Sequence, residues 1–190
     1  MQLACLAMAV VILVCLWMRP ARGGRVIAIL LAASWAWVGW AFLHLRFAPI
    51  HWVANWYAVA FFLQALQLFI YGVSQRGMEF ETGNTVRAGI GVFFLLCALL
   101  AMPAAAHLTG REWMQAELFA MTPDATALAT LGLLLLVKGH VAAWLVIIPL
   151  AWCLVTGATL WALEAPEALI LPAGAILTII LMLMPVNQRG

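Results

Sequence analysis

The few charged residues of the chain divide it into seven long stretches that carry no charge and are mostly apolar. A helix needs about 20 apolar residues to cross the hydrocarbon core of a bilayer, and most of the stretches supply that number. The pattern therefore predicts an all-α, polytopic transmembrane helical bundle that forms a single domain over residues 1–190. The seven predicted spans cover about 2–18, 26–45, 52–73, 88–107, 123–138, 141–163 and 168–185.

The fifth predicted span begins with the signals of a helix start. Thr122 suits the N-cap, Pro123 the first helical position and Asp124 the positive end of the helix dipole. Lys138 and Gly139 close this short span. A rival interpretation has six spans, with residues 125–163 forming a re-entrant hairpin or one broken span. It would leave Lys138 within the membrane or invert the last segment.

Basic residues are unevenly distributed between the two sets of links that join the seven predicted spans. Because cytoplasmic links of membrane proteins are enriched in Lys and Arg, this asymmetry predicts an outside N-terminus and a cytoplasmic C-terminus. The predicted inside links and tail hold Arg19, Arg22, Arg25, Arg76, Arg87, Lys138 and Arg189, whereas the outside links hold Arg46 and Arg111.

The composition supports a membrane protein and excludes several other classes. Hydrophobic residues make up 67% of the chain and charged residues only 8%, against about 25% charged residues in soluble domains. The small, dispersed net charge of +2 argues against nucleic-acid binding. No G-x-S-x-G elbow, P-loop or dinucleotide fingerprint indicates an enzyme. The four cysteines form no CxxC pair, and no cofactor is clearly implied.

Aromatic and polar residues gather where the second and third predicted spans meet, on the predicted outer side. One interpretation is an interfacial belt of Trp and Tyr, which many membrane proteins build. The other is a vestibule that holds a small ligand by stacking and cation–π contacts, with the start of the fifth span beside it. The candidate ligand-binding residues are Trp37, Trp40, His44, His51, Asn55, Trp56, Thr122 and Asp124.

Three histidines fall at the predicted outer ends of their spans and are candidate metal ligands: His44, His51 and His107. Imidazole with carboxylate suits zinc, and imidazole with the nearby methionine thioethers suits copper. No close HxxxH or HExxH spacing supports such a site. Histidines that are simply solvated or hydrogen-bonded at the interface are the alternative.

A polar stripe of Gln64, Gln67 and Tyr71 runs along one face of the third predicted span. It predicts either hydrogen bonds between helices or a polar lining for a solute path. We expect partners among four threonines of the fifth and sixth spans: Thr126, Thr130, Thr156 and Thr159. No ionisable residue is predicted at mid-membrane depth, where ion-coupled transporters usually keep one.

Three segments resemble the bacterial membrane protein family DUF6064. They are the stretch 47–52 with the helix 58–72, the stretch 119–126 with 130–133, and the stretch 148–152 with 156–161. The chain has His51 where relatives often carry Asn, and Ala125 where a second Pro often follows the Pro-Asp pair. The resemblance implies a multi-pass protein of a bacterial inner membrane. It implies no mechanism, because the role of the family is uncharacterised.

Three functions remain open at this point. The leading hypothesis is that the protein binds or passes a small, largely uncharged solute through the aromatic, histidine-containing vestibule. The second is an accessory or assembly subunit of a larger membrane complex, and the third is a redox protein that handles a metal or a quinone. The expected partners are membrane lipids and either further copies of the chain or other subunits of such a complex.

Overall fold

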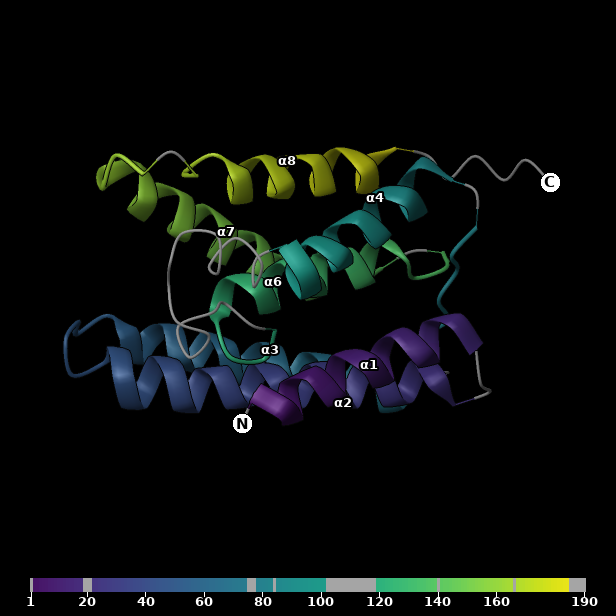
Figure 1. Cartoon of the computed structure of the whole chain (residues 1–190), viewed down its shortest axis with the longest axis horizontal. Helices are drawn as coiled ribbons and strands as arrows, with labels where there is room; N and C mark the ends of the chain where they lie inside the picture. The colour runs from purple at the N-terminus through teal and green to yellow at the C-terminus, as the bar shows by residue number, and fades with distance from the viewer. Residues whose placement is uncertain are drawn as a thin grey trace.

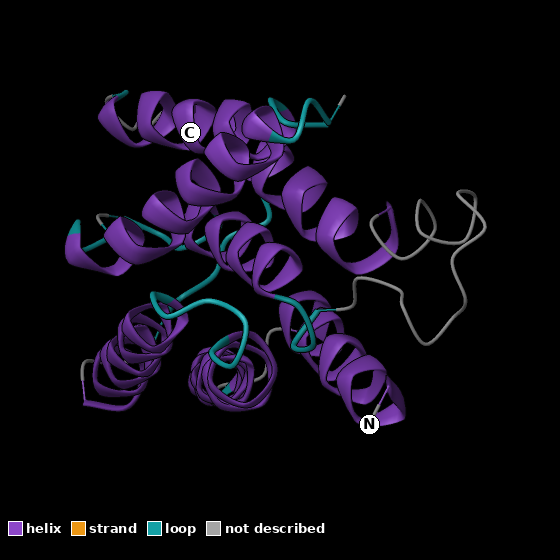
Figure 2. Ribbon diagram, turned by 90° about the vertical axis from the view of Figure 1, so that its left-hand side faces the viewer, coloured by secondary structure: helices purple, strands orange, loops and turns teal. Residues whose placement is uncertain are grey.

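A computed structural model describes residues 2–18, 22–74, 78–83, 85–101, 119–139, 141–165 and 167–184. The described part of the chain is helical except for short links and one isolated β-bridge (Figure 2). Its helices are α1 (Gln2–Met18), α2 (Gly23–Val38) continuing into the π-helical η1 (Gly39–Phe47), α3 (Ala54–Ser74), α4 (Val86–Leu96) continuing into η2 (Cys97–Ala101), α6 (Pro123–Leu135), α7 (Trp144–Ala162) and α8 (Ile170–Leu183).

Three of the described helical stretches are long and apolar enough to cross a membrane. They are Gly23–Phe47, Ala54–Val73 and Trp144–Ala162, with mean hydropathies of 2.0, 1.5 and 2.0. At 1.5 Å per residue, the shortest of them reaches about 28 Å, close to the thickness of a bilayer core. The other apolar helices are shorter: Leu3–Met18, Val86–Leu100, Pro123–Leu135 and Ile170–Leu183.

The helices lie in two groups that meet along the middle of the molecule. In the first group α1, α2 and α3 lie side by side, and in the second α6 packs against α4, α7 and α8 (Figure 1). The turned view in Figure 2 separates the lower row formed by α1, α2 and α3 from the helices above it. The groups are joined where α2 contacts α6 and where α3 contacts α7.

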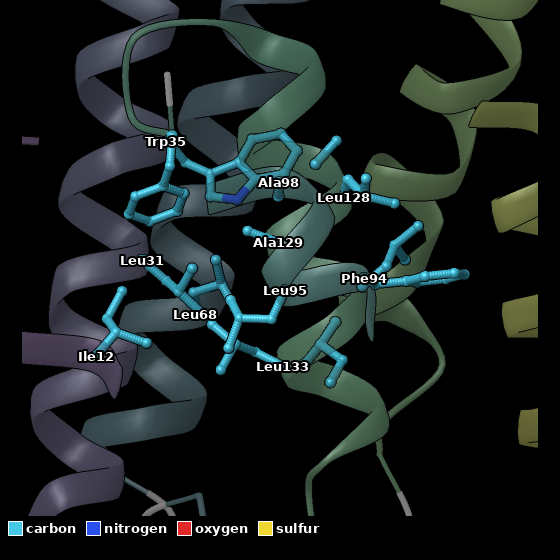
Figure 3. Close-up of a cluster of buried hydrophobic side chains, with 14 of the residues drawn as sticks. Ile12, Leu31, Trp35, Leu68, Phe94, Leu95, Ala98, Leu128, Ala129 and Leu133 are labelled. Atoms are coloured by element: carbon cyan, nitrogen blue, oxygen red, sulfur yellow. The ribbon is translucent and has the colours of Figure 1, made fainter. Parts of the chain in front are cut away.

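Helix α6 is the centre of the second group. Twelve of its thirteen residues are buried, which is the environment expected for a helix that is apolar on all sides. Small residues let its neighbours come close: a Cβ added at Gly132 would lie 2.7 Å from the carbonyl oxygen of Gly91 on α4. Figure 3 shows the resulting core, in which Trp35 reaches from α2 towards Ala129 on α6.

The carboxyl end of α6 is closed by polar contacts from the first turn of α4 and from the segment that precedes α4. The Arg87 guanidinium donates to the carbonyl oxygens of Leu134 (3.5 Å) and Gly139 (3.4 Å). An antiparallel bridge joins Phe80 to Val137, so that the backbone N–H of Lys138 donates to the Glu79 carbonyl at 2.7 Å. A cation at this end of a helix also complements its dipole.

The sequence predicted the start of α6 better than its end. Thr122 is the N-cap residue and Pro123 the first helical residue, as predicted. The helix ends at Leu135, however, and not at Lys138, because residues 136–138 turn away to form the bridge with the 79–81 segment. Gly139 adopts a positive φ of 79° beyond that bridge, so it does not cap the helix.

Candidate functional site

A polar pair marks the junction between η1 and α3. The Nδ1 atom of His44 and the Oδ1 atom of Asn55 lie 2.9 Å apart at hydrogen-bonding distance, and both residues are exposed. The ring of Trp40 lies 5.1 Å from that of His44. This stretch of η1 is π-helical, with the Ala48 N–H donating to the Leu43 carbonyl five residues earlier at 2.8 Å. Such π-helical turns are frequent at functional sites. We call His44, Asn55, Trp37 and Trp40 the mouth.

The tryptophans of this region lie mainly on the surface. Trp37 and Trp40 are 41% and 49% exposed, and Trp56 is 69% exposed. Trp37 also lines a small open hollow, whose other lining residues are Ala41, Phe42, Arg46 and Met121. Trp56 is therefore a surface side chain, whereas Trp37 stands beside the segment that leads into α6.

The three candidate metal-binding histidines are not brought together in the described structure. His51 lies in the turn before α3, where its ring stacks on that of Phe47 at a centroid distance of 5.8 Å. His44 instead pairs with Asn55. His107 lies outside the described residues. Among the described residues, no three His, Cys, Asp or Glu side chains are grouped so that they could hold a metal ion.

Asp124, in the first turn of α6, is the most informative polar residue of the protein. Its Oδ1 atom accepts a hydrogen bond from the Trp152 indole N–H at 2.6 Å and another from the Thr156 hydroxyl at 2.8 Å. Trp152 and Thr156 are the ninth and thirteenth of the nineteen residues of α7, so Asp124 lies beside the middle of that helix. We call Asp124, Trp152 and Thr156 the Asp124 site.

The expectation that no ionisable residue lies at mid-membrane depth stays a prediction, but Asp124 lies beside the middle of α7 and not beside its end. The sequence placed Asp124 at the outer end of a span, but α6 is short and begins inside the bundle (Figure 1). Both hydrogen bonds to its carboxyl come from neutral donors on α7. The positive end of the α6 dipole adds a favourable interaction with a negative charge at this position.

Aromatic side chains form the wall between the Asp124 site and the first helix group. The Trp152 ring meets the rings of Tyr57 and Phe61 on α3 edge-on, at centroid distances of 5.5 and 5.1 Å. Phe61 in turn packs on the buried Trp35 of α2 at 4.3 Å, and the Trp35 indole N–H donates to the Thr130 hydroxyl at 2.8 Å. The orientation of Trp152 is therefore fixed by α2, α3 and α6 together.

Thr126 stabilises the turn that leads into α6. Thr126 donates to the Thr122 carbonyl at 2.8 Å and accepts from the Ala120 N–H at 3.1 Å. Ala120 has a positive φ of 61°, a conformation that costs a non-glycine residue about 1 kcal/mol or more and needs such support. This contact fixes the turn that brings Met121 beside the mouth and Asp124 beside α7.

The polar stripe of α3 faces α7, but its partners are not the threonines predicted for it. Gln64 is fully buried and donates from Nε2 to the Leu145 carbonyl at 2.9 Å, and Tyr71 meets Trp144 edge-on at 5.9 Å. Thr130 donates to the Thr126 carbonyl, Thr159 donates to the Val155 carbonyl and Thr156 donates to Asp124. The threonines are therefore not the partners of the polar stripe, because their hydroxyls form hydrogen bonds with other groups nearby.

Sequence reasoning missed the aromatic side chains that frame the site: Trp35, Phe61 and Trp152. Each lies within a long apolar stretch and looks like any other core or interface residue. One signal was available, since Trp152 and Thr156 are four residues apart and share one face of a helix. Two hydrogen-bond donors on one face of an apolar helix require an acceptor from a neighbouring helix.

Comparison with known proteins supports the resemblance seen in the sequence. No curated protein and no solved structure matches the chain. The family DUF6064, described as a family of unknown function, matches residues 1–189, which is nearly the whole chain. The protein therefore belongs to the DUF6064 family.

Proposed function

We propose that the protein binds or passes a small, largely uncharged solute, which enters at the mouth and is held at the Asp124 site. In this proposal it is a multi-pass protein of a bacterial inner membrane, with seven spans, an outside N-terminus and a cytoplasmic C-terminus. The three long apolar helices support insertion in a membrane, and the uneven placement of basic residues supports the proposed orientation. The mouth then faces outwards, on the same side as the start of α6.

The observation that carries the proposal is a half-buried carboxyl held beside the middle of α7, one of the three helices long and apolar enough to cross a membrane. Ionisable groups are costly at this depth, and those that membrane proteins keep usually mark a path for solute or ions. A carboxylate has about four lone-pair sites, and the donors on α7 occupy two of them at Oδ1. The lone pairs that remain on the carboxylate can accept hydrogen bonds from a ligand that carries donors.

The surroundings of Asp124 favour an uncharged ligand. The side chains that frame the site are aromatic or carry neutral hydroxyl groups. A solute without charge loses little on leaving water for such a setting, whereas an ion pays a much larger desolvation cost. Edge and face contacts with Tyr57 and Trp152 can orient a flat or compact solute, and Asp124 supplies the directional hydrogen bond.

Reconstitution into liposomes tests this proposal. Urea, acetamide and glycerol serve as probes, and their entry is followed by stopped-flow light scattering. We expect wild-type protein to accelerate at least one probe, and Asp124→Asn, Thr156→Val and the double variant with His44→Ala and Asn55→Ala to lose most of that acceleration. Thr159→Val is the matched control, because Thr159 bonds only to its own helix at Val155. Wild-type liposomes that swell no faster than empty ones would refute the proposal.

A further inference from the structure

Two glutamine side chains on α3 carry buried oxygen atoms that have no partner. Gln64 uses its Nε2 atom to reach the Leu145 carbonyl, but its Oε1 atom is buried and accepts no hydrogen bond. The Oε1 atom of Gln67, one turn further along the same face, is also buried without a partner. A side-chain amide oxygen can accept two hydrogen bonds, so both groups have unused capacity in an apolar setting.

The fully buried polar side chains other than Gln64 show that an unpaired buried oxygen is unusual in the described residues, where Arg87 Nε is the one further buried side-chain polar atom without a partner. Within the described residues they are Ser34, Thr126, Thr130 and Thr178, and each donates to the carbonyl four residues earlier in the chain. Native proteins pair nearly all buried polar atoms, and an exception needs a physical reason such as a bound molecule. The two glutamine oxygens lie on one stripe, so a single molecule can account for both.

Aromatic contacts between α3 and α7 bracket the two glutamines along α3. Phe61 meets Trp152 on one side of them, and Tyr71 meets Trp144 on the other. The Leu145 carbonyl bound by Gln64 lies 7 to 11 residues before Trp152 and Thr156, which is about 10–17 Å along α7. The glutamines therefore lie at the same α3–α7 interface as Trp152, further along it from the Asp124 site.

We propose that Gln64 and Gln67 form a second binding position for the solute, which selects small neutral molecules with two adjacent N–H or O–H groups. This inference rests on the proposed function and names the class of solute. Amide oxygens only accept hydrogen bonds, so they select donors. The pair brings no negative charge to offset a cation, and an uncompensated charge between apolar helices is strongly disfavoured. A donor with two adjacent groups can satisfy both oxygens at once.

The Tyr71–Trp144 contact gives the position a means of closing, because it is not tied to the Asp124 site as Trp152 is. Both glutamine oxygens are shielded from solvent in this structure, so solute reaches them when α3 and α7 move apart. Edge-on aromatic pairs are weak enough to open and directional enough to re-form. The Asp124 site and the glutamine pair are thus successive positions on one path.

The test uses the full chain in liposomes with urea and acetamide as N–H donors, glycerol as an O–H donor, and water. The variants are Gln64→Met and Gln67→Met, which keep the side-chain length and remove the amide. Thr178→Val on α8 is the control, because Thr178 bonds only within its own helix. If Gln64→Met does not fold, Gln67→Met carries the test, since Gln67 does not take part in the bond to Leu145.

We expect each glutamine variant to lower the protein-dependent rate at least tenfold for the probes that wild-type protein passes, with Thr178→Val close to wild type. A loss confined to urea and acetamide assigns N–H donors, and a loss confined to glycerol assigns O–H donors. Glutamine variants that pass these probes at the wild-type rate overturn the inference, as does a loss of water flux alone. Inactive wild-type protein is the separate failure of the proposed function, and the inference falls with it.

Discussion

The mouth and the Asp124 site are both polar and aromatic, yet they differ in what holds them. His44 and Asn55 pair with each other on the surface, where water competes for the same hydrogen bonds. Asp124 is bound by two α7 side chains inside the bundle, and those side chains are packed by α2, α3 and α6. The mouth is therefore a region that can be altered without affecting the fold, whereas the Asp124 site is part of what joins the helices.

Removing the Asp124 carboxyl is expected to have the largest effect on stability and tests this comparison most strongly. Asp124→Leu leaves the Trp152 and Thr156 donors without their acceptor, so we expect a loss of about 2–4 kcal/mol in the free energy of unfolding. Asp124→Asn keeps an oxygen in the same place and should lose less than half as much. Circular dichroism during unfolding in detergent measures both. Equal stability of Asp124→Leu and wild-type protein would place the carboxyl at the surface.

A methyl group added where α4 and α6 touch tests whether close packing positions the site. The Cβ of Gly132→Ala would lie 2.7 Å from the Gly91 carbonyl oxygen and 3.0 Å from the Leu95 nitrogen, so α6 has to shift. We expect a loss of about 1–3 kcal/mol in unfolding free energy. Gly89→Ala, where a Cβ meets nothing within 4 Å, is the matched control. A similar effect of the two substitutions would contradict this packing.

The Trp35–Thr130 hydrogen bond, which joins α2 of the first group to α6 of the second, has a smaller expected effect. Trp35→Phe removes the indole N–H that binds Thr130, while a ring remains to pack on Phe61. We expect a loss of about 1 kcal/mol, because Thr130 keeps its bond to the Thr126 carbonyl. Thermal unfolding of Trp35→Phe, of Thr130→Val and of the double variant measures it. Fully additive losses would show that the two side chains do not interact.

The smallest effect on stability is expected at the mouth. His44→Ala and Asn55→Ala each break an exposed hydrogen bond whose groups water can satisfy. Their unfolding temperatures should stay at the wild-type value while probe entry into liposomes falls. A large drop in unfolding temperature would show that the mouth, like the Asp124 site, joins the helices.

The presence of helices follows from local patterns in the sequence, as does the closeness of His44 to Asn55 at the junction of two of them. Apolar run length predicts a helix, and Thr122-Pro123 marks where α6 starts. The depth of that start did not follow, because it depends on where α6 packs between α4 and α7. The sequence pattern predicts Asp124 as a charge at the outer end of a span. Its hydrogen bonds to Trp152 and Thr156 on α7 appear only in the folded structure. Likewise, the hydrogen-bond partner of Gln64 is a backbone carbonyl, which a pattern of side chains cannot predict.

The central claim is that the start of α6 is an interior site below an exposed mouth. Thiol accessibility in detergent, where both faces of the protein are open, tests it most directly. The four native cysteines are replaced by alanine, and a single cysteine is introduced as Asn55→Cys or Asp124→Cys. A maleimide coupled to polyethylene glycol should label the cysteine at 55 rapidly and that at 124 at least a hundredfold more slowly, with equal labelling after unfolding. Equal rates in the folded protein would contradict the claim.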